Sequence, residues 1–313
     1  MLARLRATSI EDARRFLLEP GHLDDVPCPG CGSGQGEAAF ELHGFTYVCC
    51  GDCGSLYVSP RPTSSALARY YGESEASRLR VEYFTAESGG ARLLHVLQSR
   101  VDWIVQVIER QQCDGSDFVD VGTVYPPFLD EMHSLGLFQN RYSADPPAGL
   151  VTMLDEKGVT IGAPQTASAL VATAFEQLEH QASPAAFIRR IHGMLAPGGV
   201  LFLTTRTITG FDLQVLWGRT PYIFVPEHMN LLSVEGLRAV METAGFDLVE
   251  LSTPGQLDVE LVVDAVREDP KIELPRFVRY LVEHRSADTL ADFQAFLQRN
   301  RLSSHVRIAA RKT

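Results

Sequence analysis

The chain has 313 residues, 45% of them hydrophobic and 21% charged, and its net charge is −11. A chain of this length can bury a full hydrophobic core, and its acidic balance argues against a nucleic-acid surface. No apolar run approaches the roughly 20 residues that a membrane-spanning helix needs. The sequence opens without the apolar core and cleavage site of a secretory signal, so we expect a cytoplasmic protein. Its expected partners are a small-molecule substrate and, as an alternative role, another protein.

Residues 1–26 form an N-terminal segment with a predicted helix over 10–18, and a group of cysteines follows. Five of the six cysteines fall between residues 28 and 53, and four of them form two Cys-x-x-Cys pairs, Cys28/Cys31 and Cys50/Cys53. A glycine after each pair permits a tight turn, and two such turns supply four thiolates for a tetrahedral zinc ion. A closed shell of this kind makes the zinc structural. We predict a zinc ribbon over 27–62 with a hairpin near its middle.

Other uses of these cysteines fit less well. A disulfide framework requires an oxidising compartment, which the expected location does not provide. A redox site requires one Cys-x-x-Cys in a βαβ unit, whereas this sequence has two around a hairpin. Cys49 stands next to Cys50 and is expected to point away from the metal, although it is also the residue that could replace a ligand.

Residues 63–112 are predicted to link the ribbon to a larger domain. A short helix is expected near its start, then a loop-rich polar stretch over 73–90. Over 91–112 the apolar residues recur with a period of 3.6, which predicts an amphipathic helix.

From residue 113 to 313 short apolar strands alternate with helical patterns. This alternation predicts an α/β fold with a doubly wound, mostly parallel sheet and an antiparallel last strand. Two insertions interrupt it, an aromatic-rich segment over 206–230 that we expect to act as a lid and a helical segment over 258–300. The predicted strands are 118–121, 142–144, 159–161, 169–174, 200–205, 246–252 and 305–310, and the predicted helices are 127–135, 184–195 and 233–244.

Several of these segments resemble the class I SAM-dependent methyltransferases, whose fold is Rossmann-like. The similar stretches cover nearly the whole chain and include 172–180, 194–205, 226–233, 244–246 and 303–312. The ribbon followed by 57–62 resembles a subset with an N-terminal zinc module, many of whose members modify sugars or natural products. The resemblance implies SAM-dependent methyl transfer to a small polar metabolite, such as a sugar nucleotide or a natural-product intermediate.

In that family an acidic residue and a glycine-rich loop after the first strand hold the methionine part of SAM. Asp120 and Gly122 match the first acid and the first glycine. Val124 and Pro126 stand where further glycines are expected, which makes the SAM-binding loop degenerate. Valine disfavours a positive φ, and proline removes an N–H donor.

The remaining cofactor positions are implied by the same resemblance. Asp145 matches the acid that binds the ribose hydroxyls, or it belongs to a solvated turn with the two prolines after it. Tyr125 in the degenerate loop either stacks on a ligand or plugs the pocket. Ala174 ends the fourth strand at the expected pocket. No carboxylate stands in 162–166, where the family often has one near the adenine.

For methyl transfer we expect His228 to be the general base, with Glu227 orienting its ring. His180 lies at the carboxyl edge of the sheet, where open α/β sheets bind ligands. The alternatives are a hydrogen-bonded structural histidine at 228 and a helix-start contact at 180. Glu176 and Glu179 are expected on a solvated face or beside a helix dipole.

Three functions therefore remain open at this stage. The first is a SAM-dependent methyltransferase with a structural zinc ion. The second is an enzyme of the same fold that has lost SAM-dependent methylation and catalyses another reaction. The third is a non-catalytic methyltransferase-like partner protein.

Overall fold

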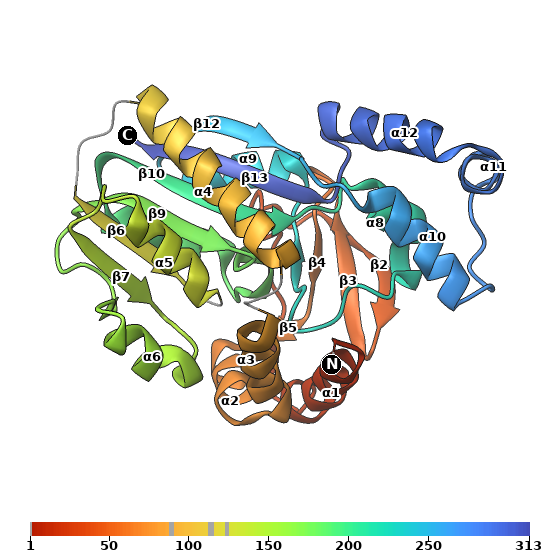
Figure 1. Ribbon diagram of the computed structural model, residues 1–313. Helices are drawn as coiled ribbons and strands as arrows, with labels where there is room; N and C mark the ends of the chain where they lie inside the picture. Colours follow the sequence, from red (N-terminus) through yellow and green to blue (C-terminus); the bar gives the residue numbers. More distant parts are fainter. Residues whose placement is uncertain (1, 88–90, 112–115, 123–124) are drawn as a thin grey trace.

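A seven-stranded sheet forms the centre of the computed structural model, which describes residues 2–87, 91–111, 116–122 and 125–313 (Figure 1). The strand order is β12-β13-β10-β9-β6-β7-β8. The last strand, β13, runs antiparallel to both of its neighbours, whereas β6 to β10 are parallel. The predicted sheet is thus confirmed. Its strands are β6 (Asp117–Val121), β7 (Asn140–Ala144), β8 (Thr160–Ile161), β9 (Ala169–Phe175), β10 (Leu195–Arg206), β12 (Phe246–Ser252) and β13 (His305–Lys312).

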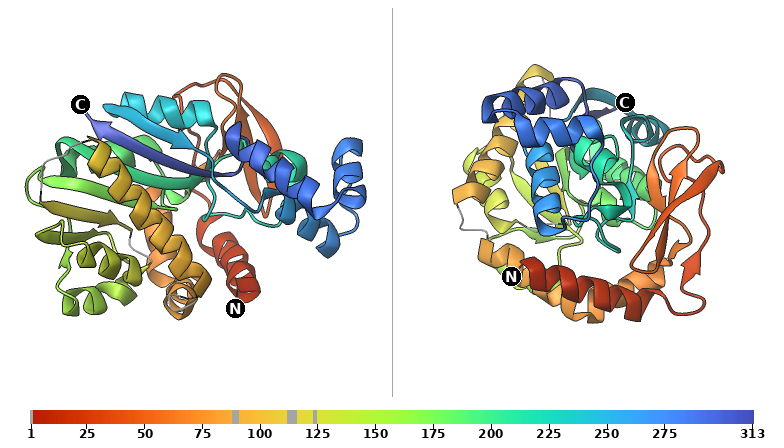
Figure 2. Two further views of the ribbon diagram at one scale, coloured as in Figure 1. Left: turned by 45° about the horizontal axis from the view of Figure 1, so that its top comes forward. Right: turned by 90° about the vertical axis from the view of Figure 1, so that its right-hand side faces the viewer.

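Helices cover both faces of the sheet. On one face α4 packs through Leu97, Val101 and Ile104, residues three or four apart that share one side of a helix. On the other face α7 and α9 bury Ile188, Leu237 and similar residues, and Figure 2 shows α9 across the sheet from α4. The first face carries α4 (Ala91–Gln111), α5 (Pro126–Ser134), η1 (Ala148–Leu150) and α6 (Val151–Glu156), and the second α7 (Pro184–Met194) and α9 (Val234–Thr243).

The loop-rich stretch predicted over 73–90 is wrong, because Glu75–Glu87 form the helix α3. The Asp12 carboxylate accepts a hydrogen bond from the backbone N–H of Ala76 and so caps the start of this helix. Ala76 and Leu79 are buried. Contacts from elsewhere in the chain therefore make this segment helical, although its own sequence is polar. Beside it lie α1 (Leu2–Leu17) and α2 (Ser64–Glu73).

The ribbon is a second, four-stranded sheet in the order β11-β4-β3-β2. Its predicted hairpin is present as β2 and β3, joined by a turn at His43 and Gly44. The outermost strand, β11, comes from far along the chain and pairs antiparallel with β4. The strands are β2 (Gly36–Leu42), β3 (Phe45–Cys50), β4 (Leu56–Val58) and β11 (Asn230–Leu231), and a separate pair joins β1 (Leu23–Asp24) to β5 (Arg61–Pro62).

The two predicted insertions take different positions. In residues 206–230, α8 (Phe211–Leu216) is followed by a short turn, where Trp217 packs edge-on against Phe40 of the ribbon. The helical insertion forms an arm at one end of the molecule (Figure 1). The arm consists of α10 (Asp258–Glu268), α11 (Arg276–His284) and α12 (Ala287–Arg299). Of the helices in the described ranges, none has both the length and the apolarity that crossing a bilayer demands.

One buried carboxylate fixes this arm to the sheet. Asp258 is 2% exposed and accepts hydrogen bonds from the Gln294 amide, the Ser303 hydroxyl and the Ser304 backbone N–H. These three donors come from α12 and from the residues just before β13. The arm is therefore joined to the sheet at the start of its antiparallel strand.

Replacing Asp258 with alanine leaves those buried donors without their acceptor. We expect Asp258→Ala to lower the free energy of unfolding by about 3 kcal/mol, measured by urea denaturation. The matched control is Asp264→Ala on the same helix, whose ion pair with Arg267 is exposed and is worth under about 1 kcal/mol. Equal losses in the two variants would contradict this role for Asp258.

Candidate functional site

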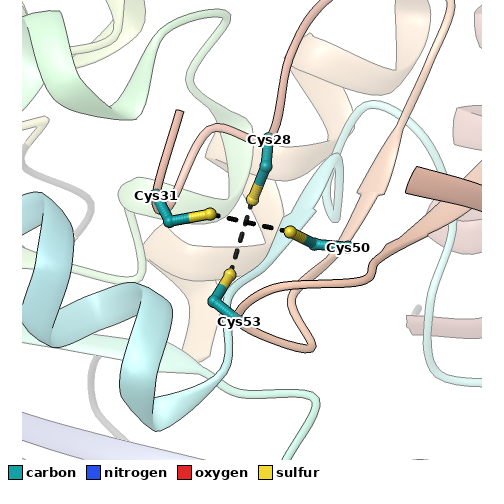
Figure 3. Close-up of side chains that lie close together, drawn as sticks. All are labelled: Cys28, Cys31, Cys50 and Cys53. Atoms are coloured by element: carbon teal, nitrogen blue, oxygen red, sulfur yellow. Dashed lines mark hydrogen bonds between the residues drawn. The ribbon is translucent and has the colours of Figure 1, made fainter. Parts of the chain in front are cut away.

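The four predicted metal ligands converge. The sulfur atoms of Cys28, Cys31, Cys50 and Cys53 all lie within 4.8 Å of one another, and Figure 3 shows them pointing at a common centre. Two of the sulfur–sulfur distances, from Cys28 to Cys53 and from Cys31 to Cys50, are 3.6 Å. A tetrahedron with zinc–sulfur bonds of about 2.3 Å has edges of about 3.8 Å. The donor set and its geometry therefore fit a tetrahedral zinc ion.

The two Cys-x-x-Cys turns have the same backbone structure. Gly32 and Gly54, with φ of 77° and 70°, each donate a hydrogen bond to the carbonyl of the first cysteine of their pair. Only glycine adopts this conformation without strain, so the glycine after each pair is what closes the turn.

The thiols of the cluster differ in their electrostatic surroundings. Burial and the neighbouring Cys53 raise the pKa of Cys28, against the backbone N–H groups that lower it. A bound divalent cation would reverse this by taking the thiolate form. Cys49 does not belong to the four-sulfur cluster found among the described residues, in line with the expectation that it points away.

A second cluster lies where β9 ends. His180 follows β9, Glu227 precedes β11, and Arg80 reaches them from α3. The guanidinium of Arg80 pairs with the Glu227 carboxylate and donates to Nε2 of His180, 3.1 Å away. Nδ1 of His180 lies 3.6 Å from the same Glu227 oxygen. The structure thus brings together two of the three predicted catalytic residues.

These contacts fix the form of the imidazole. An arginine can only donate, so Nε2 of His180 accepts and its proton is on Nδ1, facing Glu227. Burial, with Arg80 and His228 nearby, holds the pKa of His180 well below its ordinary value. His180 is therefore neutral at physiological pH.

His228 has different surroundings from those expected. Its ring packs against Phe224 with ring centres 5.6 Å apart, and Glu227 pairs with Arg80 instead of orienting it. Burial and the charges of Arg206 and Arg80 lower the pKa of His228 to about 3. Its Nδ1 is buried and has no hydrogen-bond partner among the described residues.

The glutamates near β9 are buried or paired, so the expected solvated face is wrong for them. Glu176 accepts hydrogen bonds from Arg100 and Thr204 at 2.7 and 2.8 Å. Burial raises its pKa, but Arg100 and His305 outweigh that effect and the pKa is lowered. Glu179 is 2% exposed, and burial together with Glu176 raises its pKa to about 7.

The predicted cofactor turn keeps its first two landmarks. Asp120 is buried and accepts a hydrogen bond from Thr173, and Gly122 has a φ of 75°. The side chain of Gln177 lies against Gly122, where a Cβ would collide with it. Val124 lies outside the described residues, and Pro126 is the first residue of α5.

The other predicted cofactor residues are dispersed. The guanidinium carbon of Arg100 lies 5.7 Å from the centre of the Tyr125 ring. Asp145 is largely exposed, with a φ of 53°, and forms an ion pair with Arg190. Ala174 is fully buried in the core of the sheet, so its side chain is inaccessible to a ligand.

Two arginines of this site were not expected from the sequence. Arg80 lies in a segment predicted to be loop, and no local pattern indicates its partners. Arg100, which is 4% exposed, could have been recognised as a buried charge from the sequence pattern, because it interrupts the apolar face of α4 between Leu97 and Ile104. Its Nε and Nη1 are buried without partners among the described residues. A charged residue on a buried helix face needs a partner inside the molecule, which here is Glu176.

A sequence comparison with protein families matches a methyltransferase domain to residues 81–251, more than half of the chain. A search of curated proteins found no match. The solved structures that are similar include an S-adenosylmethionine-dependent methyltransferase from Mesorhizobium loti, with 13% identity, 66% of this chain and 96% of that chain covered, and a TM-score of 0.42.

Two further solved structures are similar to this chain. Phosphoethanolamine N-methyltransferase 2 from Haemonchus contortus, in complex with phosphomonomethylethanolamine and S-adenosylhomocysteine, has 14% identity over 82% of this chain and 62% of that chain, with a TM-score of 0.46. The cyclopropane synthase MmaA2 from Mycobacterium tuberculosis has 13% identity over 67% of this chain and 84% of that chain, with a TM-score of 0.37.

The cysteine cluster predicts that replacing Cys50 and replacing its neighbour Cys49 have different effects on zinc content and stability. We expect Cys50→Ser to lose bound zinc and to be destabilised by on the order of 4 kcal/mol or more. Cys49→Ser, one residue away, keeps the metal and its stability. Zinc released to a chromogenic chelator and urea denaturation measure the two effects. Equal zinc content in both variants would show that the cluster does not hold zinc.

The raised pKa of Glu179 predicts a pH dependence of stability. The folded chain keeps a proton that the unfolded chain releases, so this contribution is complete below about pH 4.5 and is lost as the pH rises through about 7. Glu179→Gln stays neutral at every pH. Between about pH 5 and pH 8 its free energy of unfolding, measured by urea denaturation, should therefore exceed that of the parent by up to about 3 kcal/mol. Exposed Glu242→Gln is the control. A gain that does not vary with pH would rule this out.

Proposed function

Because the chain belongs to the methyltransferase family, as its match to the methyltransferase domain shows, we propose that it transfers a methyl group from SAM to a small polar metabolite. The class of acceptor we propose is a sugar nucleotide or a natural-product intermediate with a hydroxyl, amine or acidic C–H group. The observation that supports this most is the convergence of His180, Glu227 and Arg80 at the carboxyl edge of the sheet.

In this proposal Glu227 accepts the proton of the acceptor. Its Oε2 atom faces Arg80 and His180, the side chain is 15% exposed, and we assign its second oxygen to the substrate. Arg80 places a positive charge beside this carboxylate. Nδ1 of neutral His180 lies 3.6 Å from Oε2, which is longer than a hydrogen bond.

His228 remains part of the proposal as a neutral imidazole at the same edge. Since its pKa is about 3, it is unprotonated at physiological pH and a weak base, so it can accept a hydrogen bond. It follows Glu227 in the sequence and stands two residues before the buried Asn230. Its ring faces Phe224. We assign it a secondary role in binding the acceptor.

The residues present fit the methionine end of SAM better than its adenosine end. Asp120 and Gly122 keep the turn after β6. When bound, SAM supplies an electrophilic methyl group for an in-line displacement. At the adenosine end Asp145 is engaged by Arg190. At the methionine end Gln177 must move away from Gly122. We therefore propose weak binding of SAM, with zinc in a purely structural role.

The same two contacts favour a second candidate. An enzyme that has lost SAM-dependent methylation would keep Gln177 against Gly122 and the Asp145 carboxylate paired with Arg190. Its chemistry would then use the acid and base groups at His180 and Glu227 alone.

A titration separates these candidates. By calorimetry the protein should bind SAM saturably, and Glu227→Gln should bind it equally while methyl transfer falls by about 10²-fold or more, measured as S-adenosylhomocysteine release with a panel of sugar nucleotides. Glu235→Gln, exposed on α9, is the matched control and should behave as the parent. Absence of heat and of a thermal shift at millimolar SAM would refute the first candidate and leave the second.

A further inference from the structure

Asn230 connects the ribbon to the candidate catalytic residues. Its backbone pairs with Tyr57 of the ribbon, and its side chain, buried at 1% exposure, faces the loop after β9. The amide nitrogen donates to the carbonyl oxygens of Leu178, Glu179 and Gln181 at 3.1, 3.2 and 2.8 Å. That loop carries His180, so three of the four loop residues 178–181 are held by one side chain.

Arg61 holds the other end of the Asn230 amide. It is 3% exposed, and its guanidinium donates to the Asn230 Oδ1 atom at 3.0 Å and to the Ala182 carbonyl at 2.7 Å. A third hydrogen bond goes to the carbonyl of Val58. No carboxylate pairs with Arg61 in the part of the chain that the structure describes. A charge buried among neutral acceptors is costly, which points to a role besides stability.

The backbone repeats this link. The N–H of Val58 donates to the Met229 carbonyl, and the N–H of Met229 donates to the Glu179 carbonyl. The ribbon strand, the segment 229–231 and the loop 178–181 are thus hydrogen-bonded side by side. Glu227 stands two residues before this segment, and His180 stands inside this loop. The distance between Glu227 and His180 is therefore set where Arg61 and Asn230 meet.

We propose that Arg61 and Asn230 are positioning residues, through which the ribbon sets the geometry of the His180–Glu227–Arg80 cluster. Neither touches the reacting groups directly. The inference rests on the proposed function for the role of that cluster, whereas the link itself concerns only residues of this chain. The ribbon then acts as part of the catalytic scaffold and does more than stabilise the chain.

The test uses the tautomer of His180, which is independent of any substrate. In the parent labelled with ¹⁵N-histidine, His180 should give one fixed tautomer with the proton on Nδ1, assigned by its loss in His180→Gln. In Arg61→Lys the zinc content and the helical circular dichroism should stay unchanged while this signature is lost to a mixture of tautomers. Lysine keeps the charge but cannot contact three acceptors in one plane.

Two further variants make the result decisive. Asn230→Ala, which removes the link from the other side, should have the same effect and decides the matter if Arg61→Lys fails to fold. Arg14→Lys is the matched control, because Arg14 contacts the ribbon only at the His43 carbonyl in the hairpin turn and is exposed. It should leave the His180 signal as it is in the parent. Unchanged His180 signals in both Arg61→Lys and Asn230→Ala would overturn the proposal.

Methyl transfer gives the second measurement. If the parent binds SAM, Arg61→Lys should lower kcat by about 10²-fold with an unchanged KM for SAM, as expected when catalytic groups are displaced by about 1 Å. A kcat equal to that of the parent contradicts the positioning role. If the parent does not bind SAM, the proposed function fails, and the histidine spectra still decide whether Arg61 and Asn230 position the cluster.

Discussion

The antiparallel pairing of β11 with β4 ties the ribbon sheet to the loop at the carboxyl edge of the seven-stranded sheet. It spans two residues of β11, yet its neighbours on both sides are chemically important. On one side are Glu227 and His228, and on the other the Ser233 hydroxyl donates to the carbonyl of Cys53, one of the four clustered cysteines. The proposed metal site and the proposed catalytic site therefore lie at the two ends of one short segment.

Several buried charges gather at the carboxyl edge of the sheet. Arg80, Arg100 and Glu176 are each paired there, because an unpaired charge inside a protein is costly. Burial and the charge of Arg80 hold the pKa of His180 well below its ordinary value, so this histidine is neutral. In the proposed function this edge of the sheet takes up the proton of the acceptor.

The sheet and the cysteine cluster could be predicted because their signals are local. Buried strands such as 169–174 are continuous apolar runs, and the cysteine spacing determines a turn geometry. Helix α3 and the pairing of Arg80 with Glu227 could not be predicted, since they depend on contacts between residues 64 and 147 positions apart, respectively. The same holds for β11, because two residues carry no strand signal, and for the burial of Glu179. Long-range packing decides these features.

The origin of β11 bears on how the chain folds. The ribbon sheet draws its outer strand from Asn230 and Leu231, so it stays incomplete during synthesis until most of the chain has emerged. Until then β4 has an open edge, which in a nascent chain invites wrong pairing. A fragment cut after the ribbon would keep that edge. The ribbon is therefore incomplete as a separate module, since its sheet takes strands from two distant parts of the chain.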